Sequence, residues 1–298
     1  MKFRKALLIY NGEAGQKDLD KTLGACVPVI ASQVEELVLL ATKKPGHAKE
    51  ICQERGEAVD AIFILGGDGT VHEVINGLGS LDKRPVIGIL PNGTCNDFSR
   101  ALNIPQDIKK AAQALFEGEI VDVDAARVND AYFLNFWGTG IITETSSNIE
   151  PGEKRILGKI SYYLSAIRTI SKSEAFSFTL SYEGKQIEGE AVMILVLNGS
   201  FIGTRPLPVP HIQINDGLLD VVVIKNSSLS AFRELLSLKR SWTPQNEEDT
   251  GIIYFQTRRI KIETAERIDA DTDGEVYLQT PADITSLKQH FKMISHPV

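Results

Sequence analysis

A carboxylate stands inside a glycine-rich loop in the first third of the chain. The loop reads Gly-Gly-Asp-Gly-Thr over residues 66–70, and its glycines let a ligand approach the main chain closely. The apolar run Ala61–Leu65 before it predicts a buried strand, and apolar residues of helical spacing follow Thr70, the expected N-cap. This order directs backbone N–H groups and a helix dipole at an anion. It predicts a phosphate site that contains Gly66, Gly67, Asp68, Gly69 and Thr70.

The acidic residue of this loop, Asp68, needs its own explanation. A carboxylate beside a phosphate repels the ligand unless a cation or a proton transfer makes use of it. The alternative is an ordinary turn between a strand and a helix, in which Asp68 is structural. The chemistry favours a catalytic Asp68, which either organises a Mg²⁺-nucleotide or shares the work of accepting a proton.

Two further loops follow predicted strands in the same part of the chain. Asn11 comes after the apolar strand Lys5–Tyr10, and the stretch from Asn92 through Gly93 to Thr94 comes after Pro85–Leu90. In parallel sheets, ligands bind beyond the carboxyl ends of the strands. The three loops are therefore expected to meet around one ligand, and two glycine loops suit a polyphosphate better than a single phosphate.

The elements that position these loops change character along the chain. Strands and helices alternate up to about residue 120, which predicts an α/β domain with a parallel sheet covered on both faces. Beyond it, strictly alternating stretches such as Phe176–Tyr182, a turn at 183–185 and the strand Gln186–Leu197 predict antiparallel hairpins. The predicted fold is an α/β N-terminal domain followed by a C-terminal β-sandwich domain.

Two acidic turns of the second half carry candidate residues. The turn over 271–275 includes Asp273, which could supply the base that a phosphotransferase needs near its acceptor hydroxyl. The alternative is a plain hairpin turn. The turn over 212–218 combines Asp216 with glycine and exposed carbonyls, which a hard divalent cation accepts. One carboxylate makes a weak metal site, so the residues alone favour an ordinary turn there.

Composition limits the classes of function. Acidic residues outnumber basic ones by 39 to 32, and the net charge of −7 argues against a broad nucleic-acid footprint. Three scattered cysteines fit a reducing cytoplasm. Since no apolar stretch approaches the length that crosses a bilayer, the expected membrane contact is peripheral. Arg205 and the basic residues near 154–159 either meet anionic lipid headgroups or form a solvated face.

Taken in order, these motifs resemble the diacylglycerol kinase catalytic family and, more narrowly, its soluble bacterial lipid kinases. The resemblance extends over nearly the whole chain. The matching motifs are Gly-Gly-Asp-Gly-Thr at 66–70 with Glu73, Pro-Asn-Gly-Thr at 91–94 with Asn96 and Asp97, Asn-Gly at 198–199, Asn-Asp-Gly-Leu-Leu-Asp at 215–220 and Asp-Gly-Glu at 273–275.

The resemblance implies a nucleotide-binding α/β domain over 1–124, a β-sandwich lipid domain over 125–285 and a tail over 286–298 that returns to the first domain. It implies that ATP binds the three loops and Glu275, and that Asp273 is the general base on a lipid hydroxyl. It further implies a structural Mg²⁺ held by Asp216 and the backbone oxygens of Gln213 and Leu218.

The implied reaction is ATP-dependent phosphorylation of a lipid, with diacylglycerol converted to phosphatidic acid. The implied place is the cytoplasm, peripheral at the inner membrane face where the lipid lies, with no nucleic-acid partner. The sequence leaves a homodimer open. It also leaves the lipid open, because acyl-chain pockets are built from interchangeable apolar residues.

One loop departs from the family pattern. The family's first loop commonly reads Asn-Pro-x-Ser/Ala-Gly, whereas residues 11–15 read Asn-Gly-Glu-Ala-Gly, so an acid is added beside the phosphates. This departure motivates a non-catalytic lipid- or nucleotide-binding protein as one alternative. NAD kinase, which shares the Gly-Gly-Asp-Gly-Thr loop, is the other. The motifs at 215–220 and 273–275 favour the lipid kinase over the NAD kinase.

Overall fold

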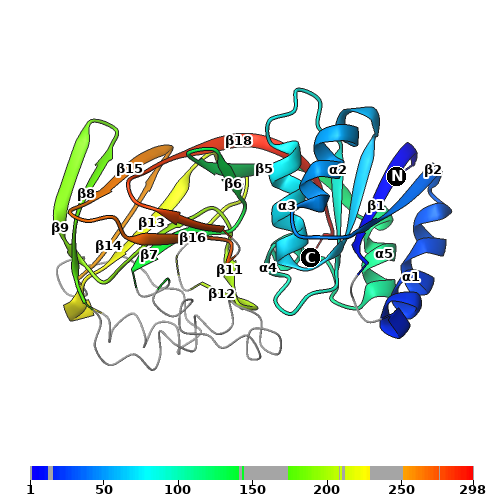
Figure 1. Cartoon of the computed structure of the whole chain (residues 1–298), viewed down its shortest axis with the longest axis horizontal. Helices are drawn as coiled ribbons and strands as arrows, with labels where there is room; N and C mark the ends of the chain where they lie inside the picture. Colours follow the sequence, from blue (N-terminus) through cyan, green and yellow to red (C-terminus); the bar gives the residue numbers. More distant parts are fainter. Residues whose placement is uncertain are drawn as a thin grey trace. The chain divides into compact units, whose positions relative to one another are not determined.

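The computed structural model describes residues 2–12, 16–140, 143, 174–207, 209, 212–228, 251–274 and 276–297. The chain forms two compact units, one of Met1–Val123 with Gln289–Val298 and one of Asp124–Lys288 (Figure 1). Glu275 and the basic residues near 154–159 lie outside the described residues, and their predicted roles stay predictions.

The first unit is built on a parallel sheet. Its strands run in the order β2 (Val34–Thr42), β1 (Phe3–Asn11), β3 (Ala61–Gly66) and β4 (Val86–Pro91), and all three pairings are parallel. The last part of β18 (Ala282–Ser295) adds a further parallel pairing beside β4. Every residue of β3 is buried, so both faces of this strand are covered. The predicted α/β domain with a parallel sheet is confirmed.

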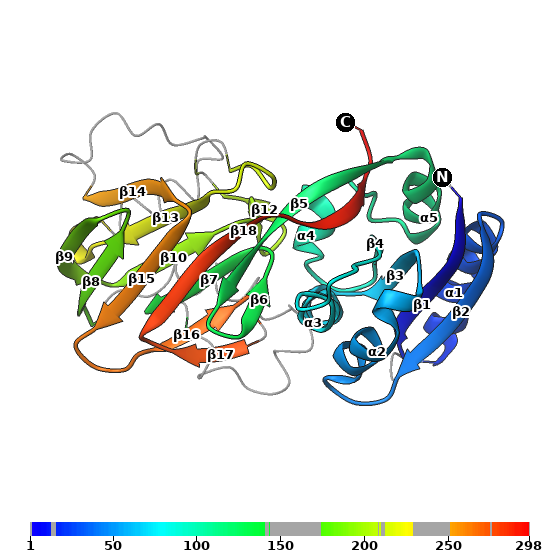
Figure 2. The same ribbon diagram turned by 90° about the horizontal axis from the view of Figure 1, so that it is seen from above.

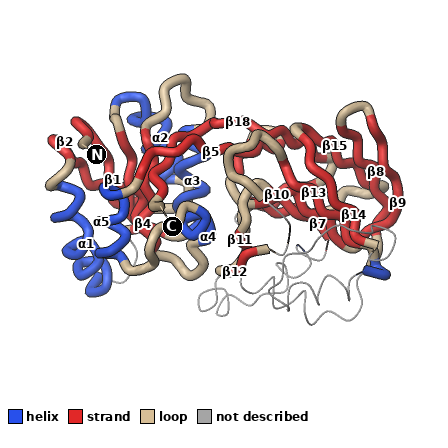
Figure 3. Tube along the Cα trace, turned by 180° about the vertical axis from the view of Figure 1, so that it is seen from behind, coloured by secondary structure: helices blue, strands red, loops and turns tan. Residues whose placement is uncertain are grey.

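Helices flank this sheet, as the tube drawing of the first unit shows (Figure 3). The helix α2 packs with α3, and α1 packs with α5. Helix α3 begins at Asp68 with Gly67 as its N-cap, so the predicted N-cap at Thr70 is wrong: it lies three residues too far along the chain. The five helices of the described part of this unit are α1 (Gln16–Ala31), α2 (His47–Arg55), α3 (Asp68–Leu78), α4 (Asp97–Ala101) and α5 (Ile108–Glu117), with a short 3₁₀ turn at Gly56–Ala58.

The second unit packs two mainly antiparallel sheets against each other. In one, β15 pairs on its two sides with β8 and the first part of β18, β9 pairs with β8, and β5 pairs with β18 and β6. Figure 2 shows β5 and β18 side by side. The strands of this sheet are β5 (Glu119–Val128), β6 (Ala131–Phe133), β8 (Phe176–Tyr182), β9 (Lys185–Ala191) and β15 (Arg259–Thr264).

The other sheet runs in the order β14, β13, β10, β7, β16, β17, and each neighbouring pair is antiparallel. The expected single strand Gln186–Leu197 is broken at Val192, which separates β9 from β10. The strands are β7 (Phe136–Gly140), β10 (Met193–Leu197), β13 (Leu219–Ile224), β14 (Ile252–Thr257), β16 (Asp269–Thr272) and β17 (Val276–Gln279), and a separate hairpin joins β11 (Phe201–Ile202) to β12 (Arg205–Pro206).

Apolar side chains from both sheets form the core of the second unit. Phe178 and Ile262 come from one sheet, and Trp137, Ile194 and Val221 come from the other, all in one buried cluster. Burial of each such side chain contributes about 1.5–3 kcal/mol to folding. The predicted β-sandwich is confirmed. None of the helices in the described ranges is long and apolar enough to cross a membrane.

Candidate active site

The glycine loops of the first unit leave the sheet at one edge. In the parallel register, Leu65 lies beside both Tyr10 and Leu90, so the carboxyl ends of β1, β3 and β4 lie next to one another. Asn11, Gly66 and Asn92 therefore stand at or next to the carboxyl ends of neighbouring strands. The structure brings the three predicted loops together at this edge, which is where α/β sheets bind ligands.

The two inner loops touch through their main chains. The N–H of Asn92 donates to the carbonyl oxygen of Gly66 over 2.9 Å. A Cβ on Gly93 would stand 2.5 Å from the Cα of Gly67, and one on Gly67 would stand 2.9 Å from the Cα of Gly93. No side chain fits at either position, so these glycines are needed for close backbone approach. A Cβ on Gly66 would meet the Thr70 Oγ1 at 2.6 Å.

Asp68 joins the two loops. Its Oδ2 accepts the N–H of Asn96 over 2.9 Å, and its Oδ1 accepts the N–H of Asp97 over 2.8 Å. The carboxylate thus satisfies the first amides of α4, where a negative group is stabilised by the helix terminus. This contact supplies a structural reason for an acid in the loop, and the catalytic role of Asp68 stays a prediction.

Asn96 holds the second loop, and sequence reasoning gave it no role of its own. Its Oδ1 accepts the N–H of Gly93 over 2.8 Å, and its Nδ2 donates to the Gly93 carbonyl over 2.9 Å. The residue has a left-handed backbone with a φ of 53°, a conformation that asparagine adopts more readily than most residues. Asn96 is therefore the side chain that fixes Gly93 against Gly67.

Glu73 is a second residue whose role the sequence did not reveal. Its carboxylate accepts the N–H of Gly46 over 2.8 Å and the N–H of Ala48 over 3.1 Å. Gly46 is the N-cap of α2 and has a left-handed φ of 82°. A carboxylate of α3 thereby caps the N-terminus of α2, the helix that packs beside it.

In the second unit, Asp273 occupies the turn between β16 and β17. Its Oδ1 accepts the N–H groups of Asn135 over 2.9 Å and Phe136 over 3.0 Å, and its Oδ2 accepts that of Leu134 over 3.0 Å. Only 3% of the residue is exposed, and its φ of 54° is left-handed. Three backbone amides therefore hold the carboxylate of the predicted base in one orientation.

The predicted metal loop lies against a residue that the sequence analysis missed. Asp124 is fully buried, and its Oδ2 accepts the N–H of Gly217 over 2.5 Å. The Oδ1 of Asp216 accepts the N–H of Leu218 over 2.9 Å. The predicted ligands, the Asp216 carboxylate and the carbonyl oxygens of Gln213 and Leu218, are all oxygen donors, which Mg²⁺ prefers, and their role as a metal site stays a prediction. In the described residues no cluster of three or more His, Cys, Asp or Glu could hold a metal by itself.

Burial perturbs two groups close to this loop, Asp220 of β13 and Tyr254 of β14. Desolvation raises the pKa of the Asp220 carboxyl, and hydrogen bonds from the Tyr254 hydroxyl at 2.5 Å and the Gln256 amide at 3.1 Å oppose that rise. Desolvation and the bond to Asp220 raise the pKa of Tyr254. Asp220 lies on β13 and Tyr254 on the neighbouring β14. Neither strand carries a predicted catalytic residue.

Two of the cysteines are unsuited to nucleophilic chemistry. All three are buried thiols outside any disulfide. Burial raises the pKa of the Cys52 thiol to about 12 and that of Cys26 to about 11. Since the thiolate is the reactive form, these thiols are inert at neutral pH. Cys95, in the second glycine loop, is 3% exposed and packs as a small apolar residue.

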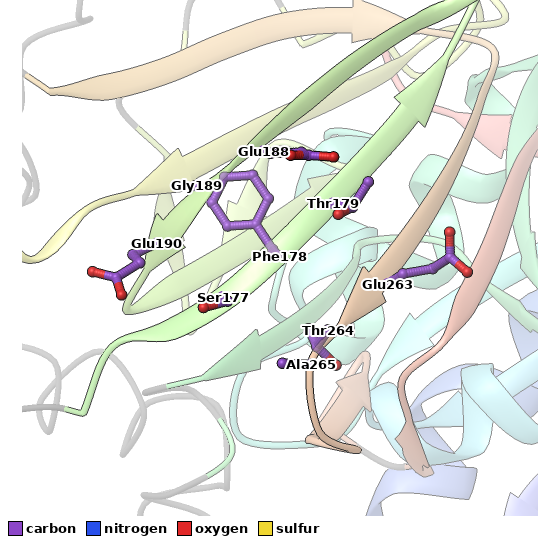
Figure 4. A pocket seen from close by; sticks show the side chains of 9 residues that line it. All are labelled: Ser177, Phe178, Thr179, Glu188, Gly189, Glu190, Glu263, Thr264 and Ala265. Carbon is purple, nitrogen blue, oxygen red and sulfur yellow. The ribbon is translucent and has the colours of Figure 1, made fainter.

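A surface pocket of about 490 Å³ lies elsewhere, over β8, β9 and β15 (Figure 4). Glu188, Glu190 and Glu263 line it together with hydroxyl groups such as Thr179. Cross-strand pairing sets Glu188 beside Thr179 and Glu190 beside Ser177. Three carboxylates repel a phosphate ligand, and the pocket contains none of the predicted site residues.

Comparison with known proteins identifies the class. Residues 5–128 match the family model described as "Diacylglycerol kinase catalytic domain", and residues 140–295 match the "YegS C-terminal NAD kinase beta sandwich-like domain". These matches cover both units and define the protein as a kinase. The chain belongs to the lipid kinase family that combines these two domains.

Particular relatives share nearly the full length. A protein of Staphylococcus carnosus named "Putative lipid kinase" is 33% identical over 98% of this chain and 97% of its own length. A "Putative lipid kinase" of Staphylococcus aureus is 33% identical over 99% and 98% of the two chains. The crystal structure of a "putative diacylglycerol kinase" from Bacillus anthracis is 43% identical, with a TM-score of 0.93 over 100% of this chain and 97% of that one.

Proposed function

We propose that this protein transfers the γ-phosphoryl group of ATP to a lipid hydroxyl, with diacylglycerol as the acceptor and phosphatidic acid as the product. The observation that carries the proposal is the backbone contact between Gly67 and Gly93 at the carboxyl edge of a parallel sheet, in a chain of the lipid kinase family. Such loops present N–H groups to phosphates at close range.

The proposed roles follow from the chemistry of phosphoryl transfer. The acceptor oxygen bonds to the γ-phosphorus, the bond from that phosphorus to the β-phosphate oxygen breaks, and ADP leaves. Backbone amides of the Gly66–Thr70 and Asn92–Thr94 loops stabilise the charge on the phosphoryl oxygens. Asp273 is the proposed acceptor of the hydroxyl proton, and three backbone amides hold its carboxylate in a fixed orientation.

Asn11, and Glu275 beyond the described residues, complete the proposed nucleotide-binding set. Mg²⁺ would neutralise charge around the transferring group and order the loop that binds it. Asp216 with the carbonyl oxygens of Gln213 and Leu218 would hold the structural ion. The support is their all-oxygen chemistry and the buried contact from Asp124 to the same loop.

The proposed place of action is the cytoplasmic face of the inner membrane, because diacylglycerol stays in the bilayer and the enzyme must reach it there. Arg205 is exposed on the hairpin of β11 and β12, where an arginine can pair with an anionic headgroup. The net charge of −7 supports the absence of a nucleic-acid partner. A homodimer stays a prediction.

One screen tests the proposal. The purified chain is incubated with γ-labelled ATP and Mg²⁺, and with diacylglycerol, ceramide, sphingosine, undecaprenol or NAD as acceptor, the lipids in mixed micelles. Labelled phosphatidic acid is the expected product. Label in NAD alone would assign the chain to NAD kinase activity. Lipid or ATP binding without turnover at any Mg²⁺ concentration would instead support a non-catalytic binding protein, which the altered loop at 11–15 motivates.

A further inference from the structure

Two of the three amides that hold Asp273 belong to peptide groups whose carbonyl oxygens are also hydrogen-bonded. The peptide group between Leu134 and Asn135 donates its N–H to Asp273, and its carbonyl oxygen accepts the Asn198 Nδ2 over 2.7 Å. The next peptide group donates its N–H, that of Phe136, to the same carboxylate oxygen. Its carbonyl, that of Asn135, accepts the backbone N–H of Asn198 over 2.8 Å. Hydrogen bonds aligned in series polarise and strengthen one another.

Asn198 is thus the common donor behind both peptide groups. Gly199 adds a third donor, since its N–H reaches the Asn135 carbonyl over 2.9 Å. A Cβ on Gly199 would stand 2.5 Å from the Asn135 Oδ1 and 3.0 Å from its Cα, so the close approach of the two segments requires glycine. The Asn-Gly pair at 198–199 fits against the strand-entry loop at 134–136 with no space for another side chain.

The side-chain amide of Asn198 uses its NH₂ group and not its oxygen for hydrogen bonding. Its Nδ2 serves the Leu134 carbonyl and, over 3.3 Å, the carbonyl of Asp124. Its Oδ1 is buried and has no hydrogen-bond partner within the described structure, and the residue is 1% exposed. An unpaired buried acceptor costs stability. The buried Oδ1 of Asn198 therefore lowers the stability of the fold. The side chain compensates by orienting two carbonyl groups, those of Leu134 and Asp124.

Asp124 extends the connection to the proposed metal loop. The same residue whose carbonyl accepts Asn198 uses its carboxylate to accept the N–H of Gly217, and its own N–H donates to the carbonyl of Ile214 over 2.7 Å. The side-chain amide of Asn198 therefore connects the Leu134 carbonyl, behind Asp273, with Asp124, which fixes the 212–218 turn.

We propose that Asn198 is a positioning residue for phosphoryl transfer. Its side chain fixes the peptide group between Leu134 and Asn135, and its main-chain N–H fixes the next one. The N–H groups of both orient the Asp273 carboxylate toward the acceptor hydroxyl, so Asn198 acts through Asp273 and not through contact with substrate. This inference rests on the proposed function. A purely structural asparagine would affect folding alone, whereas a positioning residue affects kcat through Asp273.

The test compares Asn198→Ala with Ser228→Ala in the full-length chain. Ser228 is a matched control, because it is a buried polar residue of the same unit. Its Oγ accepts the N–H of Lys225 and lies 2.9 Å from the carbonyl oxygens of Lys225 and Gly251, one of which receives its proton. Both variants are expected to melt at lower temperature. Asn198→Ala is expected to lower kcat on the order of a hundredfold, the effect of a misplacement of about 1 Å, with both KM values within about twofold. Ser228→Ala should keep the wild-type kcat.

A double-mutant cycle separates action through Asp273 from independent damage. In an Asp273→Asn background, adding Asn198→Ala should lower kcat by less than about threefold, because the group that Asn198 positions is already altered. A wild-type kcat in Asn198→Ala, or a full hundredfold loss in both backgrounds, would overturn the inference. If Asn198→Ala does not fold, Asn198→Ser, too short to reach the Leu134 carbonyl, makes the same comparison.

The proposed function and this inference fail differently. A wild-type chain that phosphorylates no lipid overturns the proposed function, and the positioning role falls with it. A wild-type chain that phosphorylates diacylglycerol while Asn198→Ala does so equally fast overturns only the role of Asn198.

Discussion

Gly93→Ala is the most direct test of the glycine-loop contact. The added Cβ would stand 2.5 Å from the Gly67 Cα and 2.9 Å from the Asn96 Oδ1. Carbon atoms pack at about 3.5–4.0 Å, so the two loops must separate by about 1 Å. Because both neighbours are fixed, one by backbone and one by its paired bonds to Gly93, the strain cannot relax through a flexible side chain. Overpacking of this kind costs about 1–3 kcal/mol of stability.

The functional effect should exceed the effect on stability. A displacement of about 1 Å in a positioning element lowers turnover about a hundredfold, so kcat/KM for ATP should fall by that order. The matched control is Gly24→Ala in α1 of the same unit, where an added Cβ meets nothing within 4 Å. In a helix that change should raise the free energy of unfolding by about 0.5–1 kcal/mol and leave ATP kinetics unchanged.

The assay pairs steady-state kinetics at varied ATP with urea unfolding of each variant. The reasoning is refuted if Gly93→Ala folds as stably as the wild type and uses ATP with the same kcat/KM. A loss of stability with unchanged ATP kinetics would show that the loop contact supports the fold and that the nucleotide binds elsewhere.

Three further predictions concern other contacts. Asn96→Ala should raise the KM for ATP and lower the melting temperature. Asn96→Gly, which relieves the strain of the left-handed φ of 53°, should recover part of the stability and none of the ATP affinity, and wild-type ATP kinetics in both variants would contradict the role of the side chain. Glu73→Ala should lower the free energy of unfolding by about 0.5–2 kcal/mol through loss of the α2 cap, with Glu54→Ala on the exposed face of α2 as a near-neutral control in the same denaturation series. Burial raises the pKa of Asp220, so the wild type loses stability as pH rises through the folded-state pKa and the carboxyl ionises. The stability of Asp220→Asn relative to the wild type, measured by thermal unfolding from pH 4 to pH 8, should therefore increase with pH. A stability difference that stays flat or falls would contradict the raised pKa.

Local patterns in the sequence predicted the framework well. The run Ala61–Leu65 is unalternated because β3 is buried on both faces, and that pattern is typical of a parallel sheet. The alternation at Phe176–Tyr182 reflects a strand with one face in the sandwich core. Both features depend on neighbours close in sequence or on periodicity, so they are visible without coordinates.

The start of α3 shows where local rules fail. Thr70 is a residue that favours the N-cap position, yet the helix begins two residues earlier and Gly67 is the cap. The threonine side chain lies instead against Gly66, where a Cβ would come within 2.6 Å of its Oγ1. Packing between the loop and the helix, rather than capping preference, decided the boundary.

Long-range polar contacts could not be predicted from the sequence. The bonds from Asp273 to residues 134–136 span about 138 positions, and those from Asn198 to Leu134 span 64. No periodicity marks such partners, because a single acid or amide can pair with any exposed backbone group. The candidate residues were therefore named from motif chemistry, while the groups that orient them emerged only from the fold.

Strand β18 limits when the first unit can finish folding during translation, because its last part belongs to that unit. Its last residues, including Met293 beside Ile87 of β4, supply an edge of the first unit, and Phe291, Met293 and Ile294 are buried there. Until these residues are translated, β4 keeps an unpaired edge, which invites intermolecular pairing. A gene fragment ending at residue 123 would carry every glycine loop and still lack this strand. The first unit, although most of it precedes the second in the chain, is therefore completed only after the second has been translated.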